Sequence, residues 1–302
     1  MRIVLIYNPS AGFGRARKLL PKVLQAFSAH ASAEVDVLLT EYRGHATELV
    51  RDLDLSVYDA VVAAGGDGTL FEVINGYFPN SSVSRPPVGI LPVGTGNAFV
   101  RDMQLDKKDW RRAVDIICSG FVRKVDVARF DCNGTSRYFH NILGLGLVTD
   151  IAQTALKVKF LGNVSYTFGV LHRVAGMRTN IARIEYDGRS LERENLFIEI
   201  SNTRYTSNFL IAPQAKNDDG LLDITILASM PRLKLLRAFP KIFDGSHVDM
   251  PEVETFTAKS LTITTDTPRL LSPDGELLGT TPIAITCMHR FLPVLWPADQ
   301  AE

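Results

Sequence analysis

Residues 65–72, Gly-Gly-Asp-Gly-Thr-Leu-Phe-Glu, combine the residue types in this chain that point most directly to chemistry. They follow the apolar run at residues 59–64, which predicts a strand, then a glycine-rich turn, then a helix beginning near Thr69. Backbone N–H groups can converge on an anion at such a turn, because glycine has no Cβ and the helix N-terminus adds positive charge. Asp67 would repel a phosphate unless it handles a metal, a water or a proton. The alternative is a tight turn with Asp67 as an N-cap.

Two further glycine loops follow predicted strands. Residues 8–14 are Asn-Pro-Ser-Ala-Gly-Phe-Gly, and residues 92–97 are Pro-Val-Gly-Thr-Gly-Asn. The first loop is neither a Walker A loop nor a Gly-x-Gly-x-x-Gly dinucleotide loop. In the second loop the Thr95 hydroxyl could reach a phosphate or a ribose, and Asn97 could cap the next helix. Each loop alone is explained by an ordinary turn, but three of them together indicate a polyphosphate cradle.

Alternating strands and helices must position these loops. The apolar pattern predicts strands at residues 3–7, 35–39, 60–64 and 88–91, separated by helical segments. Continuous apolar strands between helices indicate a parallel sheet covered on both faces, and ligands bind such sheets beyond the carboxyl ends of the strands. All three glycine loops follow strand ends, so we expect them to converge at one edge of the sheet.

The pattern changes from about residue 121 to short alternating strands with Asp-Gly turns, which predicts a largely antiparallel second domain. Helical stretches are expected at residues 149–175 and 233–243, and the apolar tail at 290–296 is expected to return to the first domain. The expected fold class is therefore α/β + β. A doubly wound, mostly parallel α/β domain would comprise residues 1–122 with 289–302, and a mainly antiparallel β domain residues 123–288.

Composition excludes several classes of protein. The 33 acidic and 33 basic residues balance, so no global field steers the chain to nucleic acid or to a membrane, and any membrane contact must be local. Three widely spaced cysteines exclude a disulfide framework and a cysteine zinc site, and they fit a reducing compartment. No stretch approaches the roughly 20 apolar residues of a membrane helix. We therefore expect a cytoplasmic protein without a nucleic-acid partner.

Residues 272–276, Ser-Pro-Asp-Gly-Glu, place two carboxylates in one tight turn of the second domain. Asp-Gly is the commonest hairpin signal, so a solvated turn is the default expectation. If the turn faces the cradle, Asp274 or Glu276 could accept a hydroxyl proton during phosphoryl transfer.

Residues 8–12, 65–72, 92–97 and 274–276, in this order and spacing, resemble the diacylglycerol kinase catalytic-domain family. That family includes soluble bacterial lipid kinases and the sphingosine and ceramide kinases, and it shares the Gly-Gly-Asp-Gly-Thr turn with NAD kinases. The resemblance runs from the first strand to Pro297. It implies a nucleotide domain like that of NAD kinases, a β-rich lipid-binding domain, and transfer of the γ-phosphate of Mg-ATP to the hydroxyl of diacylglycerol or a related lipid, including a sphingoid base.

The resemblance also implies roles for particular residues. Glu276 matches the usual proton acceptor, but sphingosine kinases give this role to the carboxylate that matches Asp67. These two residues, with Asp274 beside Glu276, are therefore the catalytic candidates, and the base is not assigned to either one. The residues implied in nucleotide binding are Asn8, Ser10, Gly12, Thr40, Gly66, Asp67, Gly68, Thr69, Glu72 and Thr95.

Two further sites are implied in the second domain. Lys216, Asp219 and Leu221 match a magnesium site of bacterial members, where Lys216 and Leu221 could ligate only through their backbone carbonyls. The alternative there is a simple Asp-Gly turn. Asp150 matches the aspartate that recognises the lipid head group in sphingosine kinases, but it would equally suit a helix N-terminus.

Some features leave alternatives open. Phe71 and Ala98 replace the family's usual Asn and Asp, which favours some divergence in substrate or nucleotide handling. The other functions considered are an NAD kinase, although its Asn-Glu-x-Asp segment is absent, and a non-catalytic lipid- or nucleotide-binding regulator. Residues 154–178 mix apolar and basic residues, so they suit either a transient contact with the inner membrane face or a solvated helix. The sequence does not identify the lipid, and a homodimer stays open.

Overall fold

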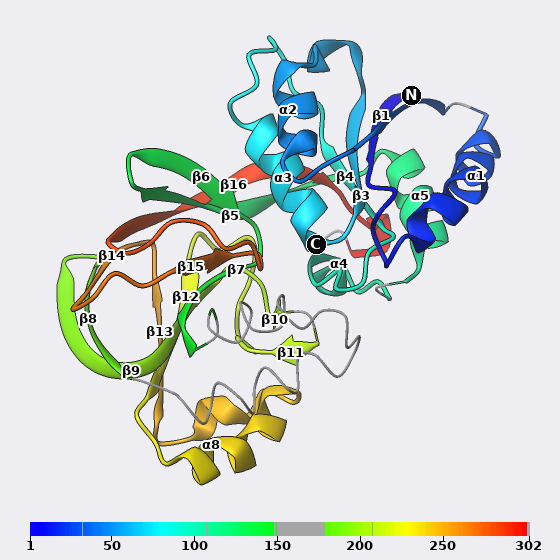
Figure 1. Cartoon of the computed structure of the whole chain (residues 1–302). Coiled ribbons are helices and arrows are strands. Elements are labelled where there is room, and N and C mark those ends of the chain that lie inside the picture. The colour runs from blue at the N-terminus through cyan, green and yellow to red at the C-terminus, as the bar shows by residue number, and fades with distance from the viewer. Residues whose placement is uncertain (32, 107, 148, 150–178, 207, 301–302) are drawn as a thin grey trace. The chain divides into compact units, whose positions relative to one another are not determined.

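Figure 1 shows the computed structural model of the chain, which describes residues 1–31, 33–106, 108–147, 149, 179–206 and 208–300. The chain divides into two compact units. The first unit comprises residues 1–127 and 289–302, and the second comprises residues 128–288. In the part of the chain that is described, no helix combines the length and the apolar character needed to cross a membrane.

The first unit is built on a parallel sheet in the order β4–β3–β1–β2. Its strands are β1 (Arg2–Tyr7), β2 (Glu34–Leu39), β3 (Ala60–Gly65) and β4 (Val88–Pro92). All residues of β3 and β4 are buried, which explains why these strands are continuous apolar runs and not alternating ones. The expected parallel sheet is therefore confirmed.

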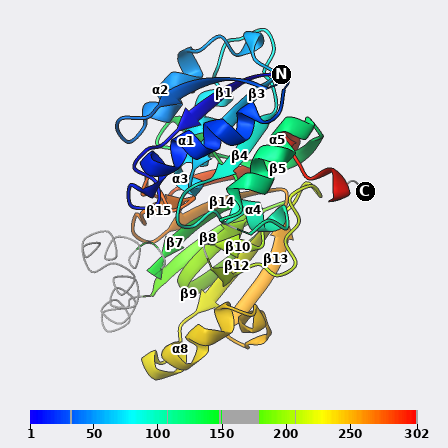
Figure 2. The same cartoon turned by 90° about the vertical axis from the view of Figure 1, so that its right-hand side faces the viewer.

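Helices cover both faces of this sheet, as a doubly wound fold requires. Figure 1 shows α1 and α5 on one side of the strands, and α2 and α3 on the other; in Figure 2, α1 and α5 lie toward the viewer. Val23 and Phe27 of α1 pack with Ala113 and Ile117 of α5 in one apolar cluster. The helical segments are α1 (Arg15–Ser28), α2 (His45–Asp52), η1 (Leu55–Val57), α3 (Asp67–Tyr77), α4 (Phe99–Asp102), α5 (Trp110–Ser119) and η5 (Ala298–Gln300).

The C-terminal segment belongs to the first unit. Val294, near the end of β16 (Ile283–Leu295), pairs in parallel with Val88 of β4. Trp296 is completely buried, donates its backbone N–H to Phe121 O at 2.8 Å, and contacts the Phe99 ring edge-on. This tail therefore completes the core of the first unit.

The second unit consists mainly of antiparallel strands, which confirms the expected β domain. Its long strand β9 (Arg189–Ser201) pairs with β7, β8 and β12. The helical segments α8 (Arg232–Ala238) and η3 (Phe239–Ile242) confirm the expected helix at 233–243, and η4 (Ser246–Asp249) follows. The stretch expected to be helical at 149–175 lies almost entirely outside the described residues. The other strands, of which β5 begins in the first unit, are β5 (Val122–Cys132), β6 (Thr135–Phe139), β7 (Ile142–Gly146), β8 (Asn180–Tyr186), β10 (Tyr205–Thr206), β11 (Phe209–Leu210), β12 (Leu222–Ala228), β13 (Val253–Ala258), β14 (Ser260–Thr265) and β15 (Leu271–Pro273).

Candidate functional site

The carboxyl ends of the four parallel strands bring four loops together at one edge of the first unit's sheet; we call residues 8–14, 40–44, 65–69 and 92–97 the rim. Asn8 N–H donates to Ala64 O and Thr40 N–H to Tyr7 O, both at 2.9 Å. Gly94 N–H donates to Gly65 O at 2.8 Å. The convergence of the three glycine loops, expected from the topology, is therefore observed. Thr40 joins them from β2.

Glycine is required where the rim loops touch. A Cβ on Gly94 would lie 2.4 Å from Gly66 Cα and 2.6 Å from Gly66 N, so the two backbones are in direct contact. A Cβ on Gly12, whose φ is +60°, would lie 3.0 Å from Val93 O. Because a Cβ at either position would overlap the neighbouring loop, only glycine lets the backbones of these loops touch. Closely packed glycine turns at strand ends are typical of sites that bind an anion such as a phosphate.

Asp67 does not cap its own helix, since the N-cap of α3 is Gly66. Its Oδ1 instead accepts hydrogen bonds from the N–H of Ala98 at 2.8 Å and of Phe99 at 3.4 Å, at the start of α4. The expectation that Asn97 caps this helix is wrong, because the N-cap of α4 is Ala98 and has no side-chain cap hydrogen bond; Asn97 Nδ2 donates back to Gly94 O at 3.2 Å. Asp67 is only half-buried, so the rim carries a carboxylate that also fixes the loop beside it.

The polar side chains of the rim divide into internal and exposed ones. Asn8 Nδ2 donates to Thr69 Oγ1 at 3.2 Å, and Asn8 Oδ1 accepts from Ser10 N–H at 3.0 Å. Thr69 is buried, whereas Ser10 and Thr95 are exposed. The internal pair therefore ties the first loop to α3. The exposed hydroxyls are available to a ligand.

Glu72 of α3 holds the connection between β2 and α2. Its Oε1 accepts from Gly44 N–H at 2.8 Å and its Oε2 from Ala46 N–H at 3.2 Å, so it caps α2. The carboxylate of Glu72 thus binds backbone donors of the β2–α2 connection, and its contact with the nucleotide stays a prediction. That connection begins with Thr40, which is buried. Gly68, in the first turn of α3, is half-buried.

The turn at residues 272–276 is not a solvated turn. The Asp274 side chain is 0% exposed, and its Oδ1 accepts from the N–H of Asn141 at 2.9 Å and of Ile142 at 3.0 Å. Its Oδ2 accepts from His140 N–H at 2.9 Å and lies 2.7 Å from His140 Nδ1. Asp274 therefore positions the turn, and the structure does not support its expected catalytic role. Glu276, only half-buried, is the carboxylate of this turn that reaches the surface.

The expected magnesium residues lie on one turn before β12. Asp219 Oδ1 accepts from Leu221 N–H at 3.0 Å, and both Lys216 and Asp219 are exposed. Burial, with the charge of Asp219 as the smaller cause, raises the pKa of Asp223 to about 6. Two neighbouring carboxylates are oxygen donors that suit a hard cation. Among the described residues, however, no group of three His, Cys, Asp or Glu is arranged to hold a metal. Asp150 and residues 154–178 lie outside the described part of the chain.

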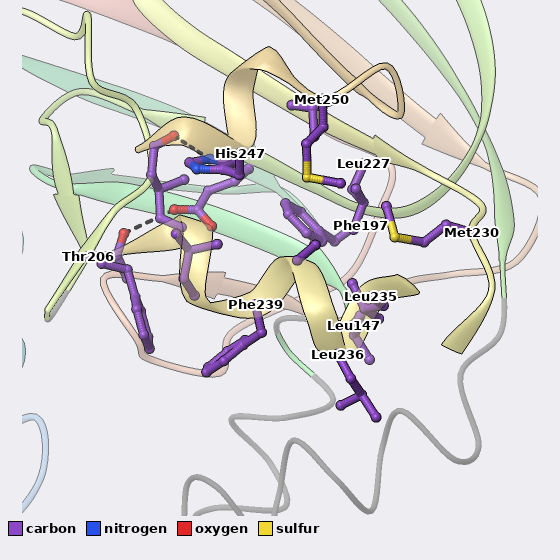
Figure 3. A pocket seen from close by; sticks show the side chains of 16 residues that line it. Leu147, Phe197, Thr206, Leu227, Met230, Leu235, Leu236, Phe239, His247 and Met250 are labelled. Atoms are coloured by element: carbon purple, nitrogen blue, oxygen red, sulfur yellow. Dashed lines mark hydrogen bonds between the residues drawn. The ribbon is translucent and has the colours of Figure 1, made fainter. Parts of the chain in front are cut away.

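An apolar pocket in the second unit was not found from the sequence (Figure 3). It has a cavity volume of about 120 Å³. Its walls come from β9, β12, α8, η3 and the segments next to them. The sequence signal was Glu199, the single acidic residue in the otherwise apolar run at 196–200. The lining residues are Leu147, Phe197, Glu199, Thr206, Phe209, Ile211, Leu227, Met230, Leu235, Leu236, Ala238, Phe239, Ile242, His247, Met250 and Val253.

The polar atoms of this pocket gather at one end, near Thr206 and His247 in Figure 3, while Met230, Leu235 and Leu236 lie toward the other. Thr206 Oγ1 donates to Glu199 Oε1 at 3.0 Å, and His247 Nε2 lies 3.1 Å from Ile211 O. Burial raises the pKa of Glu199 to about 7 and lowers the pKa of His247. Both changes favour the neutral form of the side chain.

Comparison with known proteins identifies the family. Residues 2–130 match the family model of the diacylglycerol kinase catalytic domain, and residues 142–296 match the YegS C-terminal NAD kinase beta sandwich-like domain. The diacylglycerol kinase of Bacillus subtilis (strain 168) is 31% identical over 304 residues, covering 100% of this chain and 98% of the relative. That of Staphylococcus saprophyticus is 33% identical over 302 residues, covering 99% of this chain and 96% of the relative.

Solved structures agree. Two crystal structures from Bacillus anthracis str. Sterne superpose with TM-scores of 0.82 and 0.74, at 29% and 25% identity. Each covers 99% of this chain, with 96% and 98% of the other chain covered, and the second is described as a diacylglycerol kinase. The resemblance inferred from the glycine loops and the Asp-Gly-Glu turn is confirmed, and the chain belongs to the diacylglycerol kinase catalytic-domain family.

Proposed function

We propose that the chain is a lipid kinase that transfers the γ-phosphate of Mg-ATP to the hydroxyl of diacylglycerol or a related lipid. The observation that carries this proposal is the contact between the Gly66 and Gly94 backbones, which brings two glycine turns of the rim together. A triphosphate needs several N–H donors at close range, and the glycine turns of the rim would supply them. Family membership supports a lipid as the acceptor.

Phosphoryl transfer depends mainly on positioning and on neutralising charge. The backbone of the first unit's rim would bind phosphate oxygens together with the exposed hydroxyls of Ser10 and Thr95. Asp67 is the rim carboxylate that would handle magnesium in the first unit, and Lys216, Asp219 and Leu221 are a separate candidate magnesium site in the second unit. Bound magnesium would neutralise charge on the transferred group. Thr40, whose loop Glu72 anchors to α3, would contact the nucleotide from the β2 end.

Glu276 is the proposed proton acceptor for the lipid hydroxyl. It belongs to the turn that Asp274 fixes from within the second unit, and it is only half-buried. A carboxylate held on a fixed turn can take a proton as the hydroxyl attacks. The Asp274 carboxylate contacts the backbone N–H groups of residues 140–142 and the His140 ring, and it is therefore assigned a positioning role.

The apolar pocket of the second unit is the proposed site for the lipid's apolar part. Its volume of about 120 Å³ is well below the roughly 300–1,000 Å³ of drug-sized sites, so side chains must move to admit an acyl chain. Met230 and Met250 line the pocket, and methionine adapts readily to a new neighbour.

A transient contact with a membrane surface is proposed for the segment around α8. Leu233 and Phe243 are exposed there to 60% and 52%. Arg232, Lys234 and Arg237 lie between or beside them, which suits an anionic lipid surface. Sedimentation with vesicles containing phosphatidylglycerol tests this: Leu233→Ser should weaken binding, and an unchanged bound fraction would contradict it.

The test of function is an assay with radiolabelled ATP and a panel of diacylglycerol, sphingoid base, ceramide and phosphatidylglycerol. We expect transfer to diacylglycerol. Glu276→Gln should lower kcat on the order of a thousand-fold with nucleotide affinity unchanged, because general-base losses are typically of that size. Asp67→Asn keeps an acceptor for Ala98 N–H but removes the charge, so it separates loop positioning from metal binding.

The control is Asp187→Asn, in another Asp-Gly turn of the second unit, which should leave transfer unchanged. Undiminished activity in both Asp67→Ala and Glu276→Ala would reject the assignment. NAD belongs in the panel as well, because formation of NADP would establish the NAD kinase alternative. Nucleotide binding without transfer to any acceptor would establish a regulator.

A further inference from the structure

Glu199 is a buried carboxyl group in the wall of an apolar pocket, where most carboxyl groups would be paired. It lies on β9 on the same face as Phe197, another lining residue, and is 2% exposed. Within the described residues its hydrogen-bond partner is the Thr206 hydroxyl, which uses Oε1. The other oxygen, Oε2, is therefore left for a group that enters the pocket.

Among the described residues, the groups that face Glu199 from neighbouring elements are uncharged. Thr225 of β12 and Gly144 of β7 lie opposite it in the sheet, and Thr206 comes from β10. His247 of η4 is the other titratable residue that lines the pocket, and burial lowers its pKa. Burial raises the pKa of Glu199 to about 7, and the hydrogen bond from Thr206 opposes this rise only in part.

A neutral carboxyl group has one acceptor oxygen and one O–H donor. With its acceptor oxygen bonded by Thr206, Glu199 has its proton on the remaining oxygen. An apolar pocket with one donor complements an apolar chain that carries one acceptor. A ligand without an acceptor would leave the buried donor unpaired, which disfavours binding.

We propose that Glu199 is a specificity-determining residue that donates a hydrogen bond to the carbonyl oxygen of an acyl ester in the lipid. This inference rests on the proposed function and names its substrate class: esterified lipids and not ether lipids or sphingoid bases. A lipid with an ammonium group, such as a sphingoid base, would bind the ionised form of Glu199. Its affinity would therefore rise with pH, whereas the preference for an ester should fall. A purely structural role, in which Glu199 only links β9 to Thr206, would give no preference among ligands.

The experiment compares dioctanoylglycerol with its diether analogue, which has the same chains but no carbonyl. Binding to the full chain is measured by calorimetry without ATP, at pH 6 and pH 8.5. Wild-type protein should prefer the ester by roughly ten-fold at pH 6, since an unpaired buried donor costs about that much, and less at pH 8.5. Glu199→Gln keeps an N–H donor at every pH, so its preference should persist and lose its pH dependence.

Glu199→Leu should bind both lipids equally, and its thermal unfolding shows whether it folds. If it does not fold, the pH comparison of Glu199→Gln with wild type still decides the matter. Leu236→Ala, in the apolar wall, is the matched control and should weaken both lipids by the same factor. Equal binding of ester and ether by wild type at pH 6 would overturn the proposal, as would an ester preference that survives Glu199→Leu.

The same measurements separate this inference from the proposed function. An ester preference without phosphate transfer to any lipid would reject the kinase but keep the role of Glu199. Transfer to lipids without an ester preference would reject the role of Glu199 alone. Sphingosine binding that strengthens from pH 6 to pH 8.5 would show that Glu199 recognises an amine and would overturn the proposal.

Discussion

The rim of the first unit depends on contacts between backbone atoms, whereas the pocket of the second unit depends on side chains. Backbone contacts hold the rim loops together, and a Cβ at Gly94 would lie 2.4 Å from Gly66 Cα. Side chains form the pocket, and most of them are apolar. We expect a single added Cβ to disrupt binding at the rim, because it separates the loops. We expect binding in the pocket to change gradually, as one lining side chain after another is altered.

The two regions also use their carboxylates differently. Asp67 and Glu72 of the first unit each accept two backbone N–H groups from another segment, so they act as clamps. Asp274 does the same in the second unit. Glu199 accepts one hydroxyl and no backbone N–H among the described residues. The clamps shape the chain, whereas Glu199 has capacity left for a ligand.

The largest effect is expected from Asp274→Ala. It leaves three backbone N–H groups and the His140 ring without their buried partner, which should lower the free energy of unfolding by about 3–5 kcal/mol. Urea unfolding measures this loss. Asp187→Ala is the matched control, because Asp187 also precedes a glycine, also has a positive φ of 44°, and accepts from Lys259 N–H and Ser260 N–H at the exposed surface.

The control should lose no more than about 1 kcal/mol, since exposed N–H groups can bond to water instead. Equal losses in the two variants would show that burial does not explain the effect. The clamp role of Asp274 would then be wrong.

Gly94→Ala should separate the rim loops and leave the pocket intact. Its Cβ would overlap Gly66, and a displacement of about 1 Å at a reacting group typically costs on the order of a hundred-fold in rate, so kcat/KM should fall about that far. Gly134→Ala, in the β5–β6 turn, is the control: its φ of +74° makes alanine strained, but nothing lies within 4 Å. If both variants retain full activity and nucleotide affinity, the rim is not the nucleotide site.

Glu199 should make stability depend on pH. Its pKa is raised from 4.5 to about 7 in the folded state, so its contribution is complete below about pH 4.5 and is lost as the pH rises through 7. Between pH 5 and pH 8, the unfolding free energy of wild type should fall by roughly 2 kcal/mol relative to Glu199→Gln. Urea unfolding across this range measures the difference. Glu192→Gln, an exposed change on the same strand, should show no such trend. If the difference in unfolding free energy between wild type and Glu199→Gln does not change with pH, then the pKa of Glu199 is not raised by burial.

The sequence predicted the sheet and the rim because their signals are local. Each glycine loop directly follows an apolar strand, and parallel strands end at the same edge. The backbone N–H groups that each clamp carboxylate accepts could not be predicted from the sequence. Asp67 and Ala98, for example, are 31 residues apart, and only the packing of the folded chain brings them together. The pocket was missed for the same reason: its walls come from residues between 147 and 253, on many elements.

The smallest effect is expected from Glu72→Gln, which tests whether a clamp of the first unit also matters for the ligand. Glutamine can accept only through one of the two oxygens that now hold Gly44 N–H and Ala46 N–H, so stability should fall by about 1 kcal/mol, as for a lost helix cap. The loop that begins at Thr40 should loosen, so we expect the KM for ATP to rise a few-fold with kcat nearly unchanged. Glu41→Gln, an exposed change in the same loop, is the control. A change in kcat without a change in KM would mean that Glu72 acts on the transfer step itself and not through the loop.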